Sequence, residues 1–354
     1  MPAISLDTFF ACSLMVLLML SAMAATTKLL YPSINGSSSE VAERYRKMAQ
    51  YILLNAGNPP NWGQDGQNFP EEFGLAKAGA ENVYTLDIDK VSRLNGLNVY
   101  ALSYAQMFTG LKMPDVSFSI EIKPVFETRI SLTATFRGTD ETMYQFEVST
   151  EKDGVKVPTN LKLYIIAEDF LESSNILISD GAVNLNVTIP NSINGPALLV
   201  VFARYVYNDK MFSFASYAFT HNAQKPEPSG TFLQLSPLNY TLTVQFKTQE
   251  TVLSKFYALA FNYSSEITPR ESINQSAVFS FPKFLDSSPT VLVITGKSAG
   301  RFFVECTAYP QVPLQVGASF SEASSLSDVF AYSHLVSINR AVYVCTLWFG
   351  GPKL

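Results

Sequence analysis

"VSFSIEIKPVFETRISLTATF" (116–136) is the stretch in which the hydrophobic pattern of the chain changes its period. In "VSFSIEI", Phe118, Ile120 and Ile122 alternate with polar residues, and "RISLTATF" repeats this pattern. An alternation of apolar and polar side chains over short segments is typical of strands that are buried on one face. The stretch therefore predicts that β-structure begins near residue 116.

Strand-like segments continue to the end of the chain and fall into two groups. The first group ends with "ALLVVFARYVY", and the second runs from "LNYTLTVQF" to "AVYVCTLWF". Between them, "HNAQKPEPSG" (221–230) contains two prolines and no aliphatic residue larger than alanine, as is typical of a linker. We expect two tandem antiparallel β-sandwich (Ig-like) domains, 116–222 and 231–354, joined by residues 223–230. One larger domain with a long insertion is the alternative.

Helical patterns precede the strands and define a region of residues 29–115. Apolar residues at Val41, Tyr45, Met48 and Ile52 follow the spacing of one helix face, and Gly57 is a typical stop signal. Two shorter helices are predicted in "LDIDKVSRLN", where Asp87 or Asp89 can act as the N-cap, and in "NVYALSYAQMFTGLK". We expect a short helical region next to the membrane.

The N-terminal segment of residues 1–28 predicts a membrane anchor. Residues 8–27 contain no charged side chain, and twenty helical residues span about 30 Å, the thickness of the hydrocarbon layer. A cleaved signal peptide is the main alternative, because Ala22-Met23-Ala24 resembles a cleavage site. A helix in a soluble core is the third. We expect a single-pass protein of the cell membrane with most of its chain outside the cytoplasm.

Composition and motifs argue against several function classes. The net charge of −5 offers no basic surface for nucleic acid. With only His221 and His334 and no Gly-x-Ser-x-Gly elbow, the sequence does not favour a serine hydrolase, and no cysteine–histidine spacing fits zinc. "NWGQDGQNFPEE" (61–72) partly matches a calcium loop, but Gly63 stands where an oxygen ligand is required. We expect no cofactor, no metal site and no catalytic residue.

Cysteine and asparagine residues supply the remaining candidate sites. Cys306 and Cys345 both lie in strand-like segments, where a disulfide and two buried free thiols are equally compatible with the sequence. Five sequons mark candidate N-glycosylation sites: Asn35, Asn186, Asn239, Asn262 and Asn274. About three sequons would occur by chance at this content of asparagine, serine and threonine, so they permit an outside location without proving it.

Several short motifs resemble those of archaeal type IV pilin-like surface proteins. "AISLDTFFA" (3–11) is similar to the class III signal peptide of that family, in which an acidic residue begins the anchor helix. "YILLNAGNPPNWG", "FGLA" and "DKVSRLN" are similar to an ectodomain pattern of such proteins, and "HLVSINRAVYVCTLWFGG" resembles their closing strands. The resemblance implies that Asp7 pairs with the N-terminal amine of a neighbouring subunit, and that partners include pilin-like or surface-layer proteins.

These observations favour a non-enzymatic, membrane-anchored surface protein with a structural, adhesive or minor-pilin-like role. The alternative is an ectodomain that binds a carbohydrate or another solute. An exposed cluster drawn from Tyr205, Tyr207, Phe212, Phe214 and Tyr217 would favour it, although such alternation is more often core packing. A secreted hydrolase with two close carboxylates is a third, weaker hypothesis.

Overall fold

The computed structural model describes residues 40–178, 180–268, 271–273, 276–320 and 326–352, together with Met15. Most of these residues lie in strands, as the alternating pattern predicts. Residues 40–54 form a helix. The shorter helices are α2 (Ile88–Ser92) and α3 (Tyr104–Leu111).

The helices of the described residues form within the segments in which the sequence predicts them. Asp87 is the N-cap of α2 and accepts hydrogen bonds from the N–H groups of Asp89 and Lys90. Ser103 and Gln106 form a capping box at α3, so this helix begins later than the predicted segment "NVYALSYAQMFTGLK". In the helix of residues 40–54, Tyr45, Met48 and Ile52 are buried as predicted, whereas Val41, in the first turn, is exposed.

The first β-sandwich consists of two antiparallel sheets, and the core between them includes Phe146, Leu163 and Val201. One sheet has the order β3-β4-β8, with the short β5 also on β4, and the other has the order β10-β9-β6-β7. The strands are β3 (Glu127–Arg137), β4 (Glu141–Lys152), β5 (Val155–Lys156), β6 (Thr159–Ala167), β7 (Phe170–Ile178), β8 (Ala182–Pro190), β9 (Ala197–Tyr205) and β10 (Phe212–Phe219).

The second β-sandwich has its own core, which includes Phe256, Phe279 and Ile294. Its sheets have the orders β11-β12-β16-β15 and β14-β13-β17-β18. The strands are β11 (Leu233–Leu238), β12 (Thr241–Phe246), β13 (Thr251–Leu259), β14 (Ser264–Glu266), β15 (Glu271–Ile273), β16 (Ser276–Ser280), β17 (Thr290–Ser298) and β18 (Arg301–Tyr309).

Both sandwiches have the strand arrangement of immunoglobulin-like domains. In each, the first two strands form one sheet with a later strand, β8 or β16, and the remaining long strands form the opposite sheet. The prediction of two antiparallel Ig-like sandwiches is therefore confirmed. Residues 220–232, which connect β10 to β11, contain the predicted linker.

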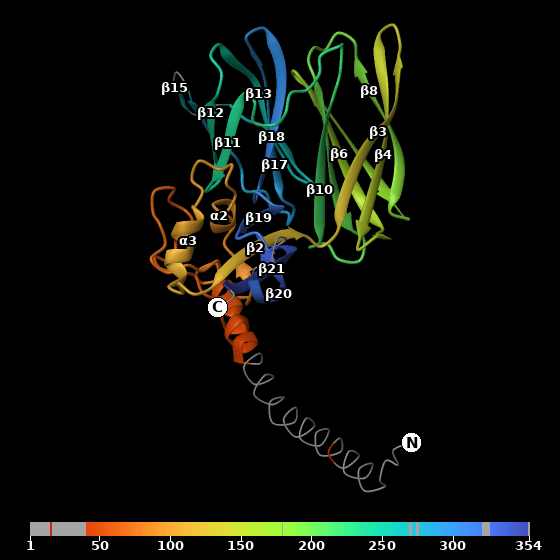
Figure 1. The fold of residues 1–354 in the computed structure, drawn as a ribbon. Helices are drawn as coiled ribbons and strands as arrows, with labels where there is room; N and C mark the ends of the chain where they lie inside the picture. Colours follow the sequence, from red (N-terminus) through yellow and green to blue (C-terminus); the bar gives the residue numbers. More distant parts are fainter. Residues whose placement is uncertain are drawn as a thin grey trace, which may run out of the picture.

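The two sandwiches stand side by side and pack face to face (Figure 1). The outer face of β6 and β9 presents Tyr164, Val200 and Phe202 to the outer face of β13 and β17, where Tyr257 and Val293 lie in the same buried cluster. We call this contact the seam. It explains why "ALLVVFARY" is apolar almost without alternation, because β9 is covered on both faces.

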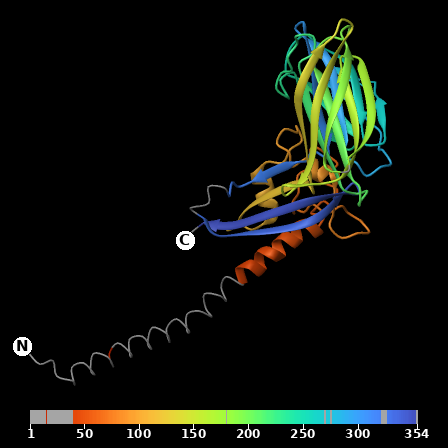
Figure 2. The ribbon, with the colours of Figure 1, turned by 90° about the vertical axis from the view of Figure 1, so that its right-hand side faces the viewer.

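Beneath the sandwiches lies a third module, the base, which contains both early and late parts of the chain (Figures 1 and 2). Its five-stranded sheet has the order β1-β20-β21-β2-β19, and the three helices belong to the same module. These strands are β1 (Thr85–Leu86), β2 (Ser117–Pro124), β19 (Leu314–Gly317), β20 (Leu326–Ile338) and β21 (Ala341–Pro352).

The base corrects the predicted domain boundaries. Residues 116–124 were expected in the first sandwich and residues 314–352 in the second, but β2 pairs with β21 and β19 instead. The first sandwich therefore begins near residue 127, and the second ends near residue 309. The physical reason is the shared inner face of this sheet, where Phe118 and Ile120 from β2 and Leu347 and Phe349 from β21 are fully buried.

Candidate functional site

Four of the five buried charged side chains of the described residues lie on helix α2 or at its ends. Helix α2 contributes Asp87, Asp89, Lys90 and Arg93, all at least nine-tenths buried. Charged side chains are rarely buried unless they are paired, so each of these groups requires a partner. The partners show what this helix does.

Lys90 and Arg93 close the loop of residues 56–76 onto α2. Lys90 Nζ donates hydrogen bonds to the carbonyl oxygens of Ala56 (2.7 Å) and Ala76 (2.8 Å), and burial lowers its pKa to about 8. Arg93 donates to the carbonyl oxygens of Trp62 and Asp65. Both cations also lie against the Trp62 ring, at 5.7 Å and 5.5 Å from its centroid. These contacts are structural.

Asp89 fastens the base to the second sandwich. Its Oδ1 accepts hydrogen bonds from Tyr309 Oη (2.6 Å) and from the N–H of Asn239 (2.7 Å). Burial raises the pKa of Asp89 to about 6, although both hydrogen bonds act in the opposite direction. Asn98 adds two bonds across the same junction, to the Pro237 carbonyl (3.1 Å) and to Gln311 Oε1 (2.8 Å). The second sandwich is thus held on the base by buried polar contacts.

The seam has fewer polar contacts, and most of them join a side chain to a backbone carbonyl. Tyr164 Oη donates to the carbonyl oxygen of Ala260 (2.8 Å), and Thr295 Oγ1 donates to that of Glu168 (2.6 Å). Gly195 has φ +84°, and a Cβ at this position would lie 2.6 Å from Phe302 Cβ of the second sandwich. The seam is therefore closely packed at Gly195.

Neither histidine forms a catalytic pair with described residues. His221 is fully buried in the first sandwich, where Nδ1 lies 2.8 Å from Tyr144 Oη, and burial lowers its pKa. His334 stacks on Tyr84, with ring centroids 3.7 Å apart. Glu305, whose pKa burial raises, accepts hydrogen bonds from the N–H groups of residues 232 and 233. These groups support the fold.

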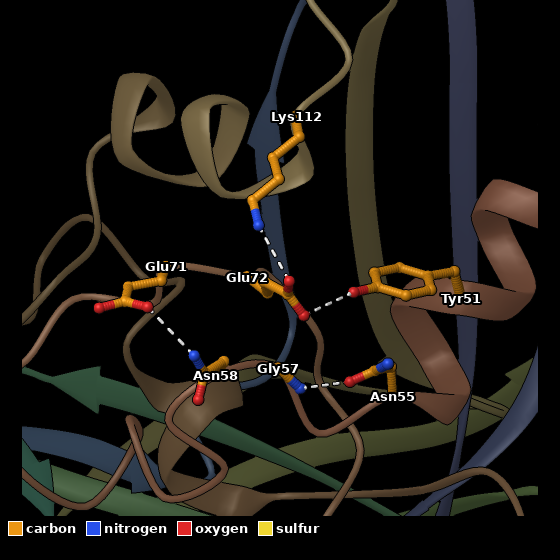
Figure 3. A network of polar contacts seen from close by, with 7 residues as sticks. All are labelled: Tyr51, Asn55, Gly57, Asn58, Glu71, Glu72 and Lys112. Atoms are coloured by element: carbon orange, nitrogen blue, oxygen red, sulfur yellow. Dashed lines mark hydrogen bonds and ion pairs between the residues drawn. The ribbon is translucent and has the colours of Figure 1, made fainter.

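The calcium-like loop is held by protein groups (Figure 3). Glu72 accepts hydrogen bonds from Lys112 Nζ (2.9 Å) and Tyr51 Oη (3.4 Å), and Asp65 accepts from the N–H of Gln67 (3.0 Å). The carbonyl oxygen of Asn61, at the first position of the register, accepts a hydrogen bond from the N–H of Gln64 within the loop (3.0 Å). Within the described residues, no group of three or more histidine, cysteine and acidic side chains is arranged to hold a metal ion.

Cys306 and Cys345, the two candidates for a disulfide, are free thiols in the structure. Of the two alternatives left open by the sequence, the structure therefore contradicts the disulfide. Cys306 lies on β18, and its Sγ is 3.7 Å from Ser216 Oγ of the first sandwich. Cys345 lies on β21 in the core of the base, opposite Ile122. The two cysteines belong to different modules, so they cannot form a bridge without rearrangement of the fold. Burial raises the pKa of the Cys345 thiol to about 12.

Three of the five sequon asparagines lie in the described part of the chain, and all three are exposed: Asn186, Asn239 and Asn262. Their glycosylation stays a prediction. Asn35 and Asn274 lie outside the described residues, as does Asp7 with the predicted anchor apart from Met15. None of the helices that the structure describes is both long and apolar enough to cross a bilayer.

The predicted aromatic cluster is divided among different environments. Phe212 and Phe214 pack in the buried cluster that includes the seam, and Tyr217 packs against the core of the first sandwich. Tyr205 contacts Tyr207 edge to face, and only Tyr207 is highly exposed (78%). The core-packing alternative describes these residues better than an exposed binding face.

Comparisons with known proteins add little to the geometry. No protein-family model matches the chain, and no curated protein matches it. Among solved structures, HBP35 of Porphyromonas gingivalis is 13% identical with a TM-score of 0.20, and the match covers 52% of this chain and 63% of that one. A two-domain fibronectin type-III segment from chicken tenascin is 8% identical with a TM-score of 0.17, covering 56% and 99%. At these TM-scores neither match bears on function.

Proposed function

We propose that the chain is a non-enzymatic surface protein, anchored in the cell membrane by residues 8–27, with its sandwiches outside the cell. Its role is structural or adhesive, including that of a minor pilin-like subunit. Its partners are the lipid bilayer and, through Asp7, other pilin-like or surface-layer proteins. The proposal combines the apolar N-terminal sequence with the way the chain enters the folded body.

The observation that carries the proposal is the position of the helix of residues 40–54. This helix packs on the base, where the Tyr45 ring lies 6.2 Å from that of Phe330 and 5.7 Å from that of Phe349. The sandwiches extend from the opposite side of the base (Figures 1 and 2). Only about twelve residues separate the apolar segment from this helix, a span of at most roughly 40 Å. An anchored chain would therefore hold its base near the membrane and its sandwiches away from it.

Membrane extraction of the full-length chain tests the anchor. We expect wild type to stay in the membrane pellet after alkaline carbonate treatment, with residues 8–27 still present by N-terminal sequencing and mass. Leu17→Arg with Leu18→Arg should release it or prevent insertion, because each arginine at the centre of a bilayer costs about 2.5–3.5 kcal/mol. Leu17→Ile with Leu18→Ile is the matched control and should behave as wild type.

A soluble wild-type protein whose N-terminus lies near Ala25 would contradict the anchor and indicate a secreted module. The pilin-like role has a separate test in Asp7→Ala. We expect this variant to lose assembly with its partners while it keeps its membrane association. Unchanged assembly would remove the subunit-pairing role of Asp7.

A ligand-binding ectodomain remains the second candidate function. A hollow at one end of the seam, between the two sandwiches, favours it.

A further inference from the structure

We infer that the two sandwiches together form a binding site for an acidic sugar, at the end of the seam nearest the base. The site is an open hollow of about 390 Å³, a volume within the usual range of small-ligand sites. Both sandwiches contribute to its lining: Asn160, Asn175, Ile176 and Arg204 come from the first, and Phe261 and Asn262 come from the second. This binding site does not depend on the membrane anchor or on the location of the sandwiches outside the cell.

Strand register brings the polar groups of the hollow onto one face of a sheet. Asn160 on β6 is directly opposite Arg204 on β9, and Asn175 on β7 is opposite Lys162, two residues further along β6. Side chains directly opposite on neighbouring strands lie about 5 Å apart at Cβ. Tyr164, next in the same alternation, donates its hydrogen bond to the second sandwich, so this face is the one that borders the seam.

Among the described residues, Arg204 is the only charged one in the lining, and no acidic side chain of that part of the chain pairs with its guanidinium. The group lies over the Phe261 ring, 4.4 Å from the centroid, while Phe261 itself is 7% exposed. Within the described residues, Arg204 forms no ion pair and no side-chain hydrogen bond. The Phe261 ring holds one face of the guanidinium and leaves its N–H groups free. Such a planar fork is suited to binding a carboxylate through two hydrogen bonds.

The surrounding groups favour a sugar as the carrier of that carboxylate. The side-chain amides of Asn160, Asn175 and Asn262 also form no hydrogen bond with described residues. An amide both donates and accepts, so three of them can bind hydroxyl groups in either direction. Leu177 of β7, directly opposite Asn160 and 69% exposed, adds an apolar surface for the C–H face of a sugar ring. The hollow therefore fits a uronic acid residue of a polysaccharide better than a simple anion.

Binding by the purified full-length chain, produced without glycosylation so that Asn262 is unmodified, tests this inference. The probes are trigalacturonate and its methyl ester, which keeps the sugar but removes the negative charge, and the assay is isothermal titration calorimetry. We expect the ester to bind at least tenfold more weakly. Arg204→Gln should weaken trigalacturonate binding about 10- to 100-fold, the range expected for hydrogen bonds to a charged group.

Arg301→Gln is the matched control, because Arg301 also lies over a phenylalanine ring, 5.8 Å from the centroid of Phe232, but away from the hollow. It should change affinity by less than twofold. Arg204→Lys keeps the positive charge but not the planar guanidinium, so it should give an intermediate loss of trigalacturonate affinity. If thermal melting shows that Arg204→Gln is misfolded, Arg204→Lys replaces it as the test. Asn160→Ala should weaken binding of the trisaccharide several-fold.

Three results would overturn the inference. Wild type without detectable trigalacturonate binding at millimolar concentration would remove the site, and equal binding of acid and ester would remove the role of Arg204. Tighter binding of inorganic phosphate or of an acidic peptide, measured by competition, would assign the hollow to another ligand. Since the assay uses purified protein, each result is independent of the membrane extraction experiment.

Discussion

Asp89→Asn should make the stability of the protein less dependent on pH, because Asp89 is a carboxyl group buried at the junction of base and second sandwich. Burial raises its pKa from the ordinary value of 3.8 to about 6. An acid with a raised pKa stabilises the folded state most below pH 3.8, where it is protonated in both states. This contribution is lost as the pH rises through 6, since ionisation is easier in the unfolded chain.

The magnitude follows from these two pKa values. At 1.36 kcal/mol for each pH unit, the interval from 3.8 to about 6 corresponds to about 3 kcal/mol. Asparagine does not titrate, yet its carbonyl oxygen can still accept from Tyr309 and from the N–H of Asn239. Relative to the variant, wild type should therefore lose about 3 kcal/mol of stability between pH 3.5 and pH 7.5.

Thermal unfolding of the full-length chain in detergent at several pH values measures this change. The midpoint of wild type should fall relative to that of Asp89→Asn by several degrees as the pH rises. Tyr309→Phe should enlarge the loss and extend it to higher pH, because it removes a hydrogen bond that favours the carboxylate. Tyr240→Phe is the control, since its ring packs on Tyr309 with centroids 5.3 Å apart. A difference between wild type and Asp89→Asn that is constant across this pH range would refute the reasoning.

Three further changes test the seam, the thiols and the loop of residues 61–72. Gly195→Ala should lower the free energy of unfolding by about 2–5 kcal/mol, because alanine there combines a left-handed backbone conformation with a clash against Phe302. Gly300→Ala is the control and should lower it by about 1–2 kcal/mol, because Gly300 has φ +81° but open space around it. Equal losses would argue against close packing at the seam. Peptide mapping without reduction should find Cys306 and Cys345 both alkylated after unfolding, and a linked peptide pair would contradict the structure. Calcium should leave the thermal midpoint unchanged, since Glu72 and Asp65 are already bonded to protein groups, and a rise of several degrees would restore the calcium interpretation.

Local features of the sequence predicted the elements well. The alternation around Phe118 and Ile130 predicted strands, the candidate cap Asp87 lies where α2 begins, and the segment after His221 with its two prolines connects two sandwiches. These features succeed because they depend on neighbouring residues. The Ig-like arrangement could be inferred from the number and spacing of the short strands.

Long-range pairing was not accessible in the same way. β2 and β21 pair across more than two hundred residues, so no local pattern indicates that the last strands leave the second sandwich for the base. The seam did have a signal, because "ALLVVFARY" and "TVLVITG" lack the alternation of a half-exposed strand. Arg204 is a charged residue near the end of β9, a strand that is covered on both faces. A charge at such a position could have identified Arg204 from the sequence as a candidate binding residue.

The most direct test of the account is the accessibility of a single cysteine in intact cells. Leu285 lies on the second sandwich and is 79% exposed, whereas the native thiols Cys306 and Cys345 are partly or fully buried. A membrane-impermeant maleimide should label Leu285→Cys in intact cells as strongly as in lysed cells, with wild type as the background. Labelling that appears only after lysis would place the sandwiches inside the cell and contradict the proposed function.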